Sequence, residues 1–375
     1  MIWLEISVIA ILSIYTLIIL VSIFVLLFPE RETDLSSFIP TKKVSILIPF
    51  RNEAQNIMHC LQGISLQDYP LELTELILIN DDSTDHSKQL VADFLRNKNI
   101  SYKLIDLKEH QLSGKKNAIE FGILQSSGSI IVTRDADTFT KNSKWLKAIV
   151  FQLQNADLVL VPVILSGSSF IQSFQQFENI AIICMGYAFA KINLPFVCSG
   201  ANLAYKKESF LKANPYQNNK HIASGDDMFL LQSFIDNGFL ISPAKNSNTI
   251  VYTNAEESLS SFINQRIRWA SKAKNLHLKT AWLMGLLLFL SNLILLFMGI
   301  SAFFGGINYK FCLFALIYKC IIEFLLLFLG KFMYRQKFNF TYYIPAFIAN
   351  IFYVPMVSVA SIIVKSKWKG RKQGV

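Results

Sequence analysis

Residues 129–137 read Ser-Ile-Ile-Val-Thr-Arg-Asp-Ala-Asp, a short apolar run followed by two aspartates that one alanine separates. The run Ser129–Arg134 has the length and the β-branched residues of a buried strand. Side chains two residues apart lie on the same side of an extended chain, so Asp135 and Asp137 should converge on one point. Such carboxylates are hard oxygen ligands, and a divalent metal there can neutralise charge that builds on a departing diphosphate.

The segments around this run alternate between strand and helix patterns. The predicted strands are Val44–Phe50, Leu73–Asn80 and Ser101–Leu107, and the predicted helices cover residues 52–67, 85–96 and 115–125. This alternation predicts an α/β fold with a Rossmann-like, mostly parallel sheet that helices cover on both faces. In such sheets ligands bind outside the carboxyl ends of the strands.

Two further strand ends carry polar residues of the same kind. Pro49-Phe50-Arg51-Asn52-Glu53 closes one strand, and Asn80-Asp81-Asp82-Ser83-Thr84-Asp85 closes the next. Each motif alone is explained as well by helix capping or a turn. Three carboxylate-bearing strand ends at one edge of a sheet favour a binding site instead.

A fourth acidic motif, Ser224-Gly225-Asp226-Asp227, precedes the apolar run 228–231. The two acids either cap a helix and favour its positive end, or supply a general base whose pKa is adjusted by its neighbour.

Apolar residues concentrate at the two ends of the chain, at residues 1–28 and from 281 onward, and the mean hydropathy is +0.38. Residues 2–28 are long enough to cross a bilayer. A cleaved signal peptide fits less well, because no basic segment precedes the run and no small-residue cleavage site follows it. We therefore expect an uncleaved anchor.

The chain carries a net charge of +10, and much of the basic excess lies beside the apolar segments. This placement is typical of the cytosolic side of a membrane protein. It argues against nucleic acid as a partner, since the soluble part has no basic stripe with interleaved aromatic residues. The five cysteines form no C-x-x-C pair, so neither a disulfide framework nor a zinc site is indicated.

Gln265-Arg266-Ile267-Arg268-Trp269 lies on a helical pattern just before an apolar segment. One interpretation is an interfacial helix that anchors Trp269 and its arginines at the membrane surface. In the second interpretation, Arg268 binds a diphosphate and Trp269 stacks on an acceptor sugar.

We expect six regions along the chain. They are a transmembrane anchor (1–28), a linker (29–42), an α/β domain (43–256), an interfacial amphipathic helix (257–280), a membrane region with about three apolar segments (281–364) and a basic tail (365–375). The anchor should run from outside to inside, residues 281–304 should cross outward and residues 311–330 should return. The segment 342–364 has the length of a full crossing, which we favour, although a re-entrant passage would keep the basic tail inside.

In this order, the motifs P-x-R-N-E, D-D-x-S-x-D, G-K, D-A-D, S-G-A-N, D-D and Q-x-x-R-W resemble those of family 2 glycosyltransferases, the inverting group with a GT-A fold. The resemblance covers roughly residues 40–270 and is strongest to the membrane-bound branch, which includes cellulose, chitin, hyaluronan and poly-N-acetylglucosamine synthases and ceramide glucosyltransferase. It implies inverting transfer of a hexosyl group from a nucleotide sugar, with a UDP-sugar as the expected donor. The acceptor would be a lipid or saccharide at the cytosolic face of the cell (inner) membrane, and Mg²⁺ or Mn²⁺ would be the cofactor.

The resemblance also implies roles for the donor side of the site. Pro49, Glu53 and Asp81 would border the nucleoside, and Lys115 of the G-K motif would approach the nucleotide. Asp135 and Asp137 would form the D-x-D motif, with Asp137 nearest the metal.

On the acceptor side, the resemblance makes Asp227 the general base, beside Asp226. Gln265, Arg268 and Trp269 would close over the diphosphate and the acceptor. The loop that would line the donor-sugar and acceptor site contains Ser199, Gly200 and Asn202.

Two departures from the family pattern are visible. The base motif reads Asp226-Asp227 where Glu-Asp is more frequent, and Lys206 and Lys207 stand where arginine is frequent. The membrane part is smaller than in the long-polymer synthases, which weakens the case for a processive polysaccharide synthase.

Two competing functions are a sugar-nucleotide-binding membrane protein without turnover and a transporter with a regulatory soluble domain. The intact acids Asp137 and Asp227 argue against the first of these. Against the transporter, the apolar segments carry few ionisable residues, essentially Lys319 and Glu323.

Overall fold

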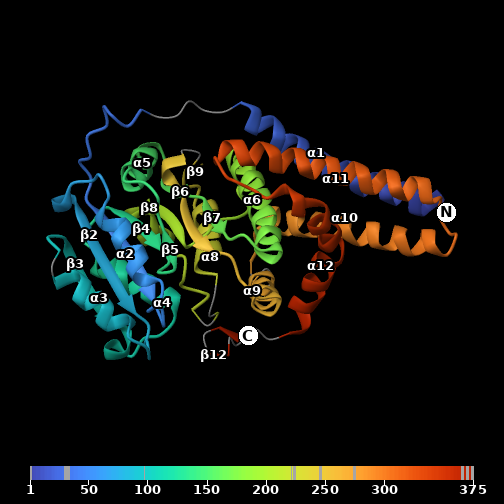
Figure 1. Cartoon of the computed structure of the whole chain (residues 1–375). Helices are drawn as coiled ribbons and strands as arrows, with labels where there is room; N and C mark the ends of the chain where they lie inside the picture. The colour runs from blue at the N-terminus through green and yellow to red at the C-terminus, as the bar shows by residue number, and fades with distance from the viewer. Residues whose placement is uncertain are drawn as a thin grey trace. The chain divides into compact units, whose positions relative to one another are not determined.

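The computed structural model describes residues 2–28, 34–96, 98–220, 222, 225–244, 247–272, 276–364, 367–368 and 371–372 (Figure 1). Ser224 of the acidic motif and parts of the linker, of the region 257–280 and of the basic tail lie outside the described residues. Contacts between residues divide the chain into two compact units. An α/β unit comprises Arg31–Leu165, Val197–Asn254 and Trp368–Val375, and a helical unit comprises Met1–Glu30, Ser166–Phe196 and Ala255–Lys367.

The α/β unit is built on a seven-stranded sheet with the strand order β3-β2-β1-β4-β8-β6-β9. The strands are β3 (Ser101–Asp106), β2 (Thr74–Asn80), β1 (Val44–Phe50), β4 (Ile130–Arg134), β8 (Asn202–Lys206), β6 (Leu158–Leu160) and β9 (Ile241–Pro243). β8 pairs antiparallel with both β4 and β6, and the remaining pairs in this sheet are parallel. The prediction of a mostly parallel α/β sheet is confirmed.

Helices cover both faces of this sheet, which explains why its central strands are apolar on both sides. On one face Val44, Ile46 and Ile48 of β1 pack into a core with α2, α3 and α5. On the opposite face Leu47 and Ile79 lie against Gly122 of α4. The helices of this unit are α2 (Ile57–Ser65), α3 (Ser87–Arg96), α4 (Lys115–Gln125), α5 (Trp145–Gln152), α7 (Lys207–Ala213) and α8 (Asp226–Asp236).

Shorter elements complete the described fold. A second sheet has the order β5-β10-β7, formed by Thr138–Phe139, Val251–Asn254 and Val163–Ser166. Two short strands, β11 (Lys367–Trp368) and β12 (Arg371–Lys372), pair with each other. The 3-10 helices are Leu71–Leu73, Leu107–His110, Leu153–Asn155, Ser247–Thr249 and Phe340–Tyr342.

The carboxyl ends of three strands lie in register, so the loops that follow them meet at one edge of the sheet. Phe50 of β1 is aligned with Asn80 of β2, and Asn80 is aligned with Asp106 of β3. The helix predicted from residue 52 begins only at Ile57, because Asn52 has a positive φ of 52° and the residues after it form a turn.

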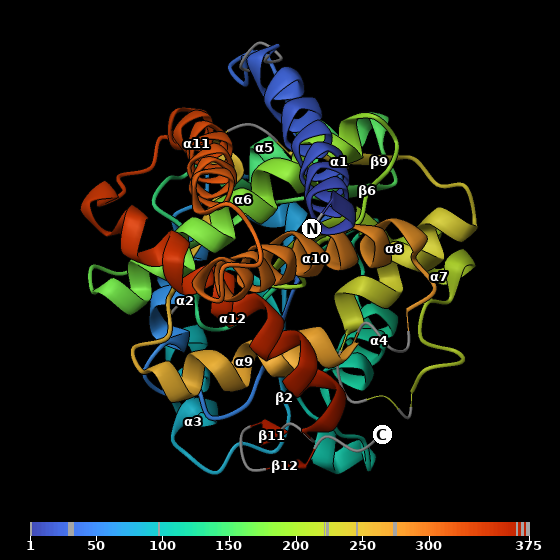
Figure 2. The ribbon, with the colours of Figure 1, turned by 90° about the vertical axis from the view of Figure 1, so that its right-hand side faces the viewer.

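The helical unit contains α1 (Ile2–Leu27), α6 (Phe170–Lys191), α9 (Leu259–Ser271), α10 (Lys279–Phe303), α11 (Tyr309–Met333) and α12 (Tyr343–Ile363), which Figures 1 and 2 show from two sides. By contacts α6 belongs here, although its sequence lies inside the region 43–256. Four described segments are long and apolar enough to cross a membrane, namely Glu5–Leu27, Lys279–Phe303, Tyr309–Met333 and Phe340–Ile363. α12 is one continuous helix with Pro355 inside it, rather than two halves broken at the prolines.

A buried polar network joins α1, α10 and α11. Lys319 is fully buried, and its Nζ lies 2.6 Å from Oε1 of Glu323 and 3.1 Å from Oδ1 of Asn292. The Tyr15 hydroxyl donates to the same Glu323 oxygen at 2.6 Å. The network therefore connects the first helix of the unit to two helices that come much later in the chain.

Replacing Lys319 with methionine should destabilise the helical unit by about 3 kcal/mol, because Glu323 is left without its cationic partner. Thermal unfolding in detergent measures the effect. In the double variant K319M/E323Q both charges are gone, and much of the stability should return. A single variant as stable as the unsubstituted chain would show that the pair contributes nothing.

Candidate active site

One lysine and two carboxylates from three elements meet at the carboxyl edge of the sheet. Lys115 is the first residue of α4, Asp135 follows β4, and Asp226 is the first residue of α8. The Lys115 Nζ lies 2.7 Å from Oδ1 of Asp135 and 3.3 Å from Oδ2 of Asp226. The structure thus brings together three residues that the sequence singled out in separate motifs.

The charge state of Lys115 follows from these neighbours. Burial disfavours its protonated form, but the carboxylates Asp135 and Asp226 outweigh burial and raise the pKa of Lys115 above its usual value. Lys115 therefore stays cationic at neutral pH. Its ammonium group forms an ion pair with Asp135, the first acid of the D-x-D motif.

Glycine at position 200 lets a loop approach this cluster closely. The Gly200 amide donates to Oδ2 of Asp227 at 3.4 Å. A Cβ at Gly200 would lie 2.7 Å from Oδ2 of Asp226 and 3.3 Å from the Lys115 Nζ. The predicted residue Gly200 is thus part of the wall of the acidic cluster, and Ser199 precedes it in the same loop.

The two adjacent acids of the fourth motif lie in different surroundings. Asp226 is buried, pairs with Lys115, and accepts at its backbone oxygen from the buried Tyr216 hydroxyl at 3.1 Å. Asp227 is partly exposed, and its Oδ1 accepts from the amide of Met228 at 2.8 Å. Only the second acid combines proximity to the cluster with access from solvent.

Arg134, the residue before the D-x-D motif, supports the turn that carries it. Its Nε donates to the Thr138 hydroxyl at 2.9 Å, and that hydroxyl donates to the backbone oxygen of Asp135 at 2.7 Å. The guanidinium is fully buried 4.7 Å from the Trp145 ring, and burial lowers its pKa. The sequence offered no sign of this role, because Arg134 reads as the end of a strand.

Asn202 has a structural role. Its Oδ1 accepts from the Trp145 indole at 3.1 Å, and its Nδ2 donates to the backbone oxygens of Pro162 and Thr249 at 3.0 Å. The side chain is fully buried. Asn202 was predicted to contact the acceptor. In the structure its side chain instead supports the start of β8, next to the loop that contains Gly200.

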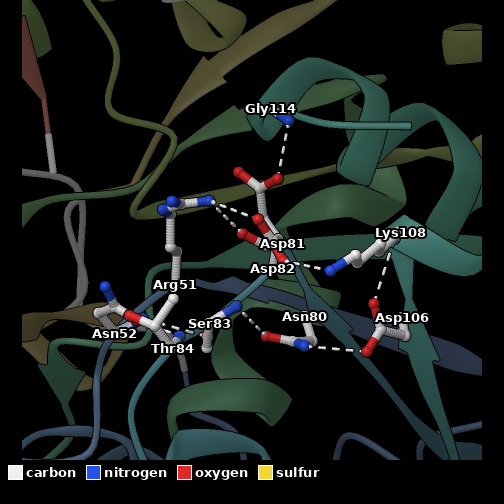
Figure 3. A network of polar contacts seen from close by, with 10 residues as sticks. All are labelled: Arg51, Asn52, Asn80, Asp81, Asp82, Ser83, Thr84, Asp106, Lys108 and Gly114. Carbon is white, nitrogen blue, oxygen red and sulfur yellow. Dashed lines mark hydrogen bonds and ion pairs between the residues drawn. The ribbon is translucent and has the colours of Figure 1, made fainter. Parts of the chain in front are cut away.

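A second network lies where β1, β2 and β3 end (Figure 3). Asp81 accepts at Oδ1 from the Gly114 amide at 3.0 Å, and its backbone oxygen accepts from Arg51 at 2.8 Å. Arg51 and Lys108 lie 3.7 and 3.8 Å from the two oxygens of Asp82. Asp81 thereby ties the β2 loop to the start of α4, next to Lys115.

The β1 loop is fastened to the β2 loop by polar contacts. Thr84 donates to Oδ1 of Asn52 from its backbone amide at 2.8 Å, and the Glu53 amide donates to the Ser87 hydroxyl at 2.7 Å. Glu53 also accepts from the Asn56 side chain. Pro49 lies in β1 itself, in register with Ile79.

The Q-x-x-R-W residues lie on α9 in the helical unit. The Gln265 side chain donates to Oε1 of Glu256 at 2.9 Å, while Trp269 is 43% exposed. Arg266, for which the motif predicts no contact with a substrate, holds α9 in place. Its buried guanidinium lies 2.8 Å from Oε2 of Glu178 on α6 and 4.3 Å from the Trp269 ring.

Among the described residues, three or more His, Cys, Asp or Glu side chains do not gather into a ready-made metal site.

Comparison with known proteins finds a family model and relatives that this chain is similar to. Residues 45–213 match the model of glycosyl transferase family 2. The chain is 27% identical over 202 residues to the glycosyltransferase AglE of Haloferax volcanii, covering 52% of this chain and 62% of that protein. It is also 27% identical over 243 residues to a poly-beta-1,6-N-acetyl-D-glucosamine synthase of Staphylococcus epidermidis, covering 64% of this chain and 56% of that protein. The matches thus span less than two thirds of these relatives.

A solved structure shares the fold. The mannosyltransferase PcManGT from Pyrobaculum calidifontis, determined in complex with GDP-Man and Mn²⁺, superposes with a TM-score of 0.63 at 17% identity. The match covers 96% of this chain and 99% of that one. The chain therefore carries a glycosyl transferase family 2 domain with the GT-A fold, matched over residues 45–213.

Proposed function

We propose that the protein is a membrane-bound inverting glycosyltransferase. It transfers a sugar from a nucleotide-sugar donor to a lipid or saccharide acceptor at the cytosolic face of the membrane, and the region 43–256 supplies most of the site. The observation that carries the proposal is the cluster of Lys115, Asp135 and Asp226, with the partly exposed Asp227 beside it, in a family 2 domain.

Asp227 is the general base in this proposal. Its position at the start of α8 and its partial exposure allow it to meet an acceptor hydroxyl. It takes the proton as the hydroxyl oxygen attacks the anomeric carbon, and the nucleoside diphosphate leaves from the opposite face. One displacement inverts the anomeric centre. Asp226 cannot play the same part while it is buried against Lys115.

Asp135 and Asp137 would hold the divalent metal, Mg²⁺ or Mn²⁺. The pair suits such an ion because both are hard oxygen donors and Asp135 already lies against a cation, the Lys115 ammonium. The bound metal would neutralise negative charge on the departing diphosphate. The Mn²⁺ and GDP-Man in the PcManGT structure support a metal-assisted donor site of this kind.

The remaining predicted residues, apart from Asn202, bind the two substrates. Pro49, Glu53 and Asp81 border the nucleoside, and hydrogen bonds from the Glu53 amide to Ser87 and from the Gly114 amide to Asp81 hold the loops beside it. Arg268 neutralises the diphosphate. Gln265 and Trp269 meet the acceptor, and the exposed Trp269 indole offers an apolar face to a sugar ring.

Arg266 is a positioning residue in this scheme. Arg266→Lys keeps the charge but loses the planar stacking on Trp269. We expect the rate of sugar transfer to fall by about tenfold. A displacement of about 1 Å at a reacting centre costs about 10²-fold, and the effect here should be smaller. Binding of the nucleoside diphosphate alone should change little. Arg96→Lys, on the exposed surface of α3, is the matched control, and equal activity of the two variants would remove the role from Arg266.

The proposal is tested by supplying membranes that contain the protein with a panel of UDP- and GDP-sugars and measuring released diphosphate. One donor should release diphosphate well above membranes without the protein. Product length then distinguishes single transfer from chain extension. Donor binding without release for every sugar in the panel would instead favour a binding protein without turnover.

A further inference from the structure

The last long helix, α12, runs in a different direction from the helices that best fit a bilayer crossing. Figure 1 shows α1 and α11 side by side, with α12 running across their common direction. In Figure 2, turned by 90°, α11 is viewed nearly down its axis while α12 is seen along its length. α1 and α11 are joined by hydrogen bonds from Tyr15 to Glu323 and from Tyr318 to Thr16. Two helices at such different orientations cannot both follow the membrane normal.

The contacts of α12 agree with this orientation. Its first residue, Tyr343, lies against the middle of α11: its hydroxyl donates to the Cys320 backbone oxygen at 2.6 Å, and its ring lies 5.2 Å from that of Phe324. Ten residues further along α12, Tyr353 packs on two other helices, α9 and α6. Its ring stacks on Phe262 of α9 at 5.1 Å, and its hydroxyl donates to Glu178 of α6 at 3.2 Å.

The start of α12 lies against the middle of α11 and not against its end. α6 meets α11 near its end, where a Cβ on Gly330 would lie 2.6 Å from Sγ of Cys184. Tyr343 meets α11 at Cys320 and Phe324, six to ten residues earlier, which is roughly 9–15 Å along the α11 axis at 1.5 Å per residue. The Tyr343 ring also lies 5.8 Å from that of Phe177 on α6, so α12 begins between α11 and α6.

The exposed side of α12 is a continuous apolar stripe. It consists of Ile344, Ile348, Phe352, Met356, Val359 and Ile363, each 48–75% exposed. The opposite side, with Phe347, Ile351 and Val354, is buried. Helices that float at a membrane surface carry a polar face, but residues 343–363 contain no charge. On its buried side, Tyr353 of α12 meets the ion pair of Arg266 on α9 and Glu178 on α6.

We propose that α12 does not cross the membrane but lies parallel to its plane inside the cytosolic leaflet, with the apolar stripe against lipid acyl chains. Only α1, α10 and α11 then cross. This replaces the full crossing that the length of residues 342–364 favours. α12 is about 31 Å long at 1.5 Å per residue, so length permits either placement, and packing decides between them.

The charge distribution fits this placement. The link between α11 and α12 carries Arg335 and Lys337, and the tail carries five more basic residues, Lys365, Lys367, Lys369, Arg371 and Lys372. If α12 lies in the cytosolic leaflet, both basic segments lie on the cytosolic side of the membrane. Basic residues beside membrane spans are enriched on that side. A crossing α12 would put the tail alone on the opposite side.

Two epitope tags on the full chain test the side of the tail. One follows Val375, and the second is inserted between Gly306 and Ile307, in the α10–α11 turn, as the control for the opposite side. Protease should remove the C-terminal tag only in inside-out vesicles and the turn tag only in right-side-out vesicles. Removal of both tags in the same vesicles would overturn the proposal.

A depth measurement tests the orientation directly. Cysteines at Ile348 and Val359, both on the exposed stripe, carry a fluorophore in proteoliposomes with quenchers at fixed lipid depths. The labelled chain without new cysteines gives the background. The two positions are about 16 Å apart along the helix. If α12 lies in the membrane plane, both labels have the same depth. If their depths differ by about 10 Å or more, out of the ~16 Å between them, α12 crosses the membrane.

Discussion

Asp227→Asn is expected to lower the rate of sugar transfer by about 10²–10⁴-fold, the usual cost of removing a general base. Donor binding should remain nearly intact, because the base acts on the acceptor hydroxyl and not on the nucleotide. The amide keeps the size of the carboxyl group and can still accept from Met228, so α8 should start as before. Turnover and nucleoside diphosphate binding are measured on the same preparation.

Two controls sharpen this experiment. Asp236→Asn makes the same chemical change at the exposed end of the same helix and should be silent. Asp226→Asn should impair donor binding as well as turnover, because it removes one of the two acids that hold Lys115. If Asp227→Asn kept more than half of the activity, the base would have to be another group.

Asp137→Ala should abolish most of the enhancement that Mn²⁺ or Mg²⁺ gives to nucleoside diphosphate binding. Loss of an outer partner of a metal ligand already costs about 10–100-fold in metal affinity, so loss of a ligand should exceed that. The measurement is a titration of the diphosphate with and without metal.

The matched control for this titration is Asp93→Ala, an exposed acid on α3. Metal-free binding should be similar in both variants, because Lys115 and the loops of Figure 3 are unchanged. Equal metal enhancement in Asp137→Ala and in the unsubstituted chain would move the metal site elsewhere.

The α/β sheet was predictable because its signals are local. The apolar runs of β1 and β4 end where polar residues begin, and α4 starts at Lys115 after a glycine with a φ of 89°. The antiparallel course of β8 was not predictable, since it depends on pairing with strands distant in sequence. Residues 52–56 failed as a helix because their polar groups bind the next loop instead.

The residue types of the candidate site were predictable from the sequence. The different role of each residue was not. Asp226 and Asp227 are indistinguishable in sequence, and only packing shows that the first is paired and buried. The role of Arg266 depends on Glu178, 88 residues away. Likewise, the hydropathy of α12 indicates a membrane helix but carries no information on its direction, which contacts with α9 and α6 determine.

The most direct test of the proposed function is the configuration of the product. The purified protein is incubated with the donor that releases diphosphate, with Mg²⁺ or Mn²⁺, and with lipid and saccharide acceptors, and the product is analysed by mass spectrometry and NMR. The account predicts an acceptor heavier by a sugar residue, joined by a β-linkage when the donor is α-linked, and absent with Asp227→Asn. An α-linked product from an α-linked donor, or transfer that persists in Asp227→Asn, would contradict it.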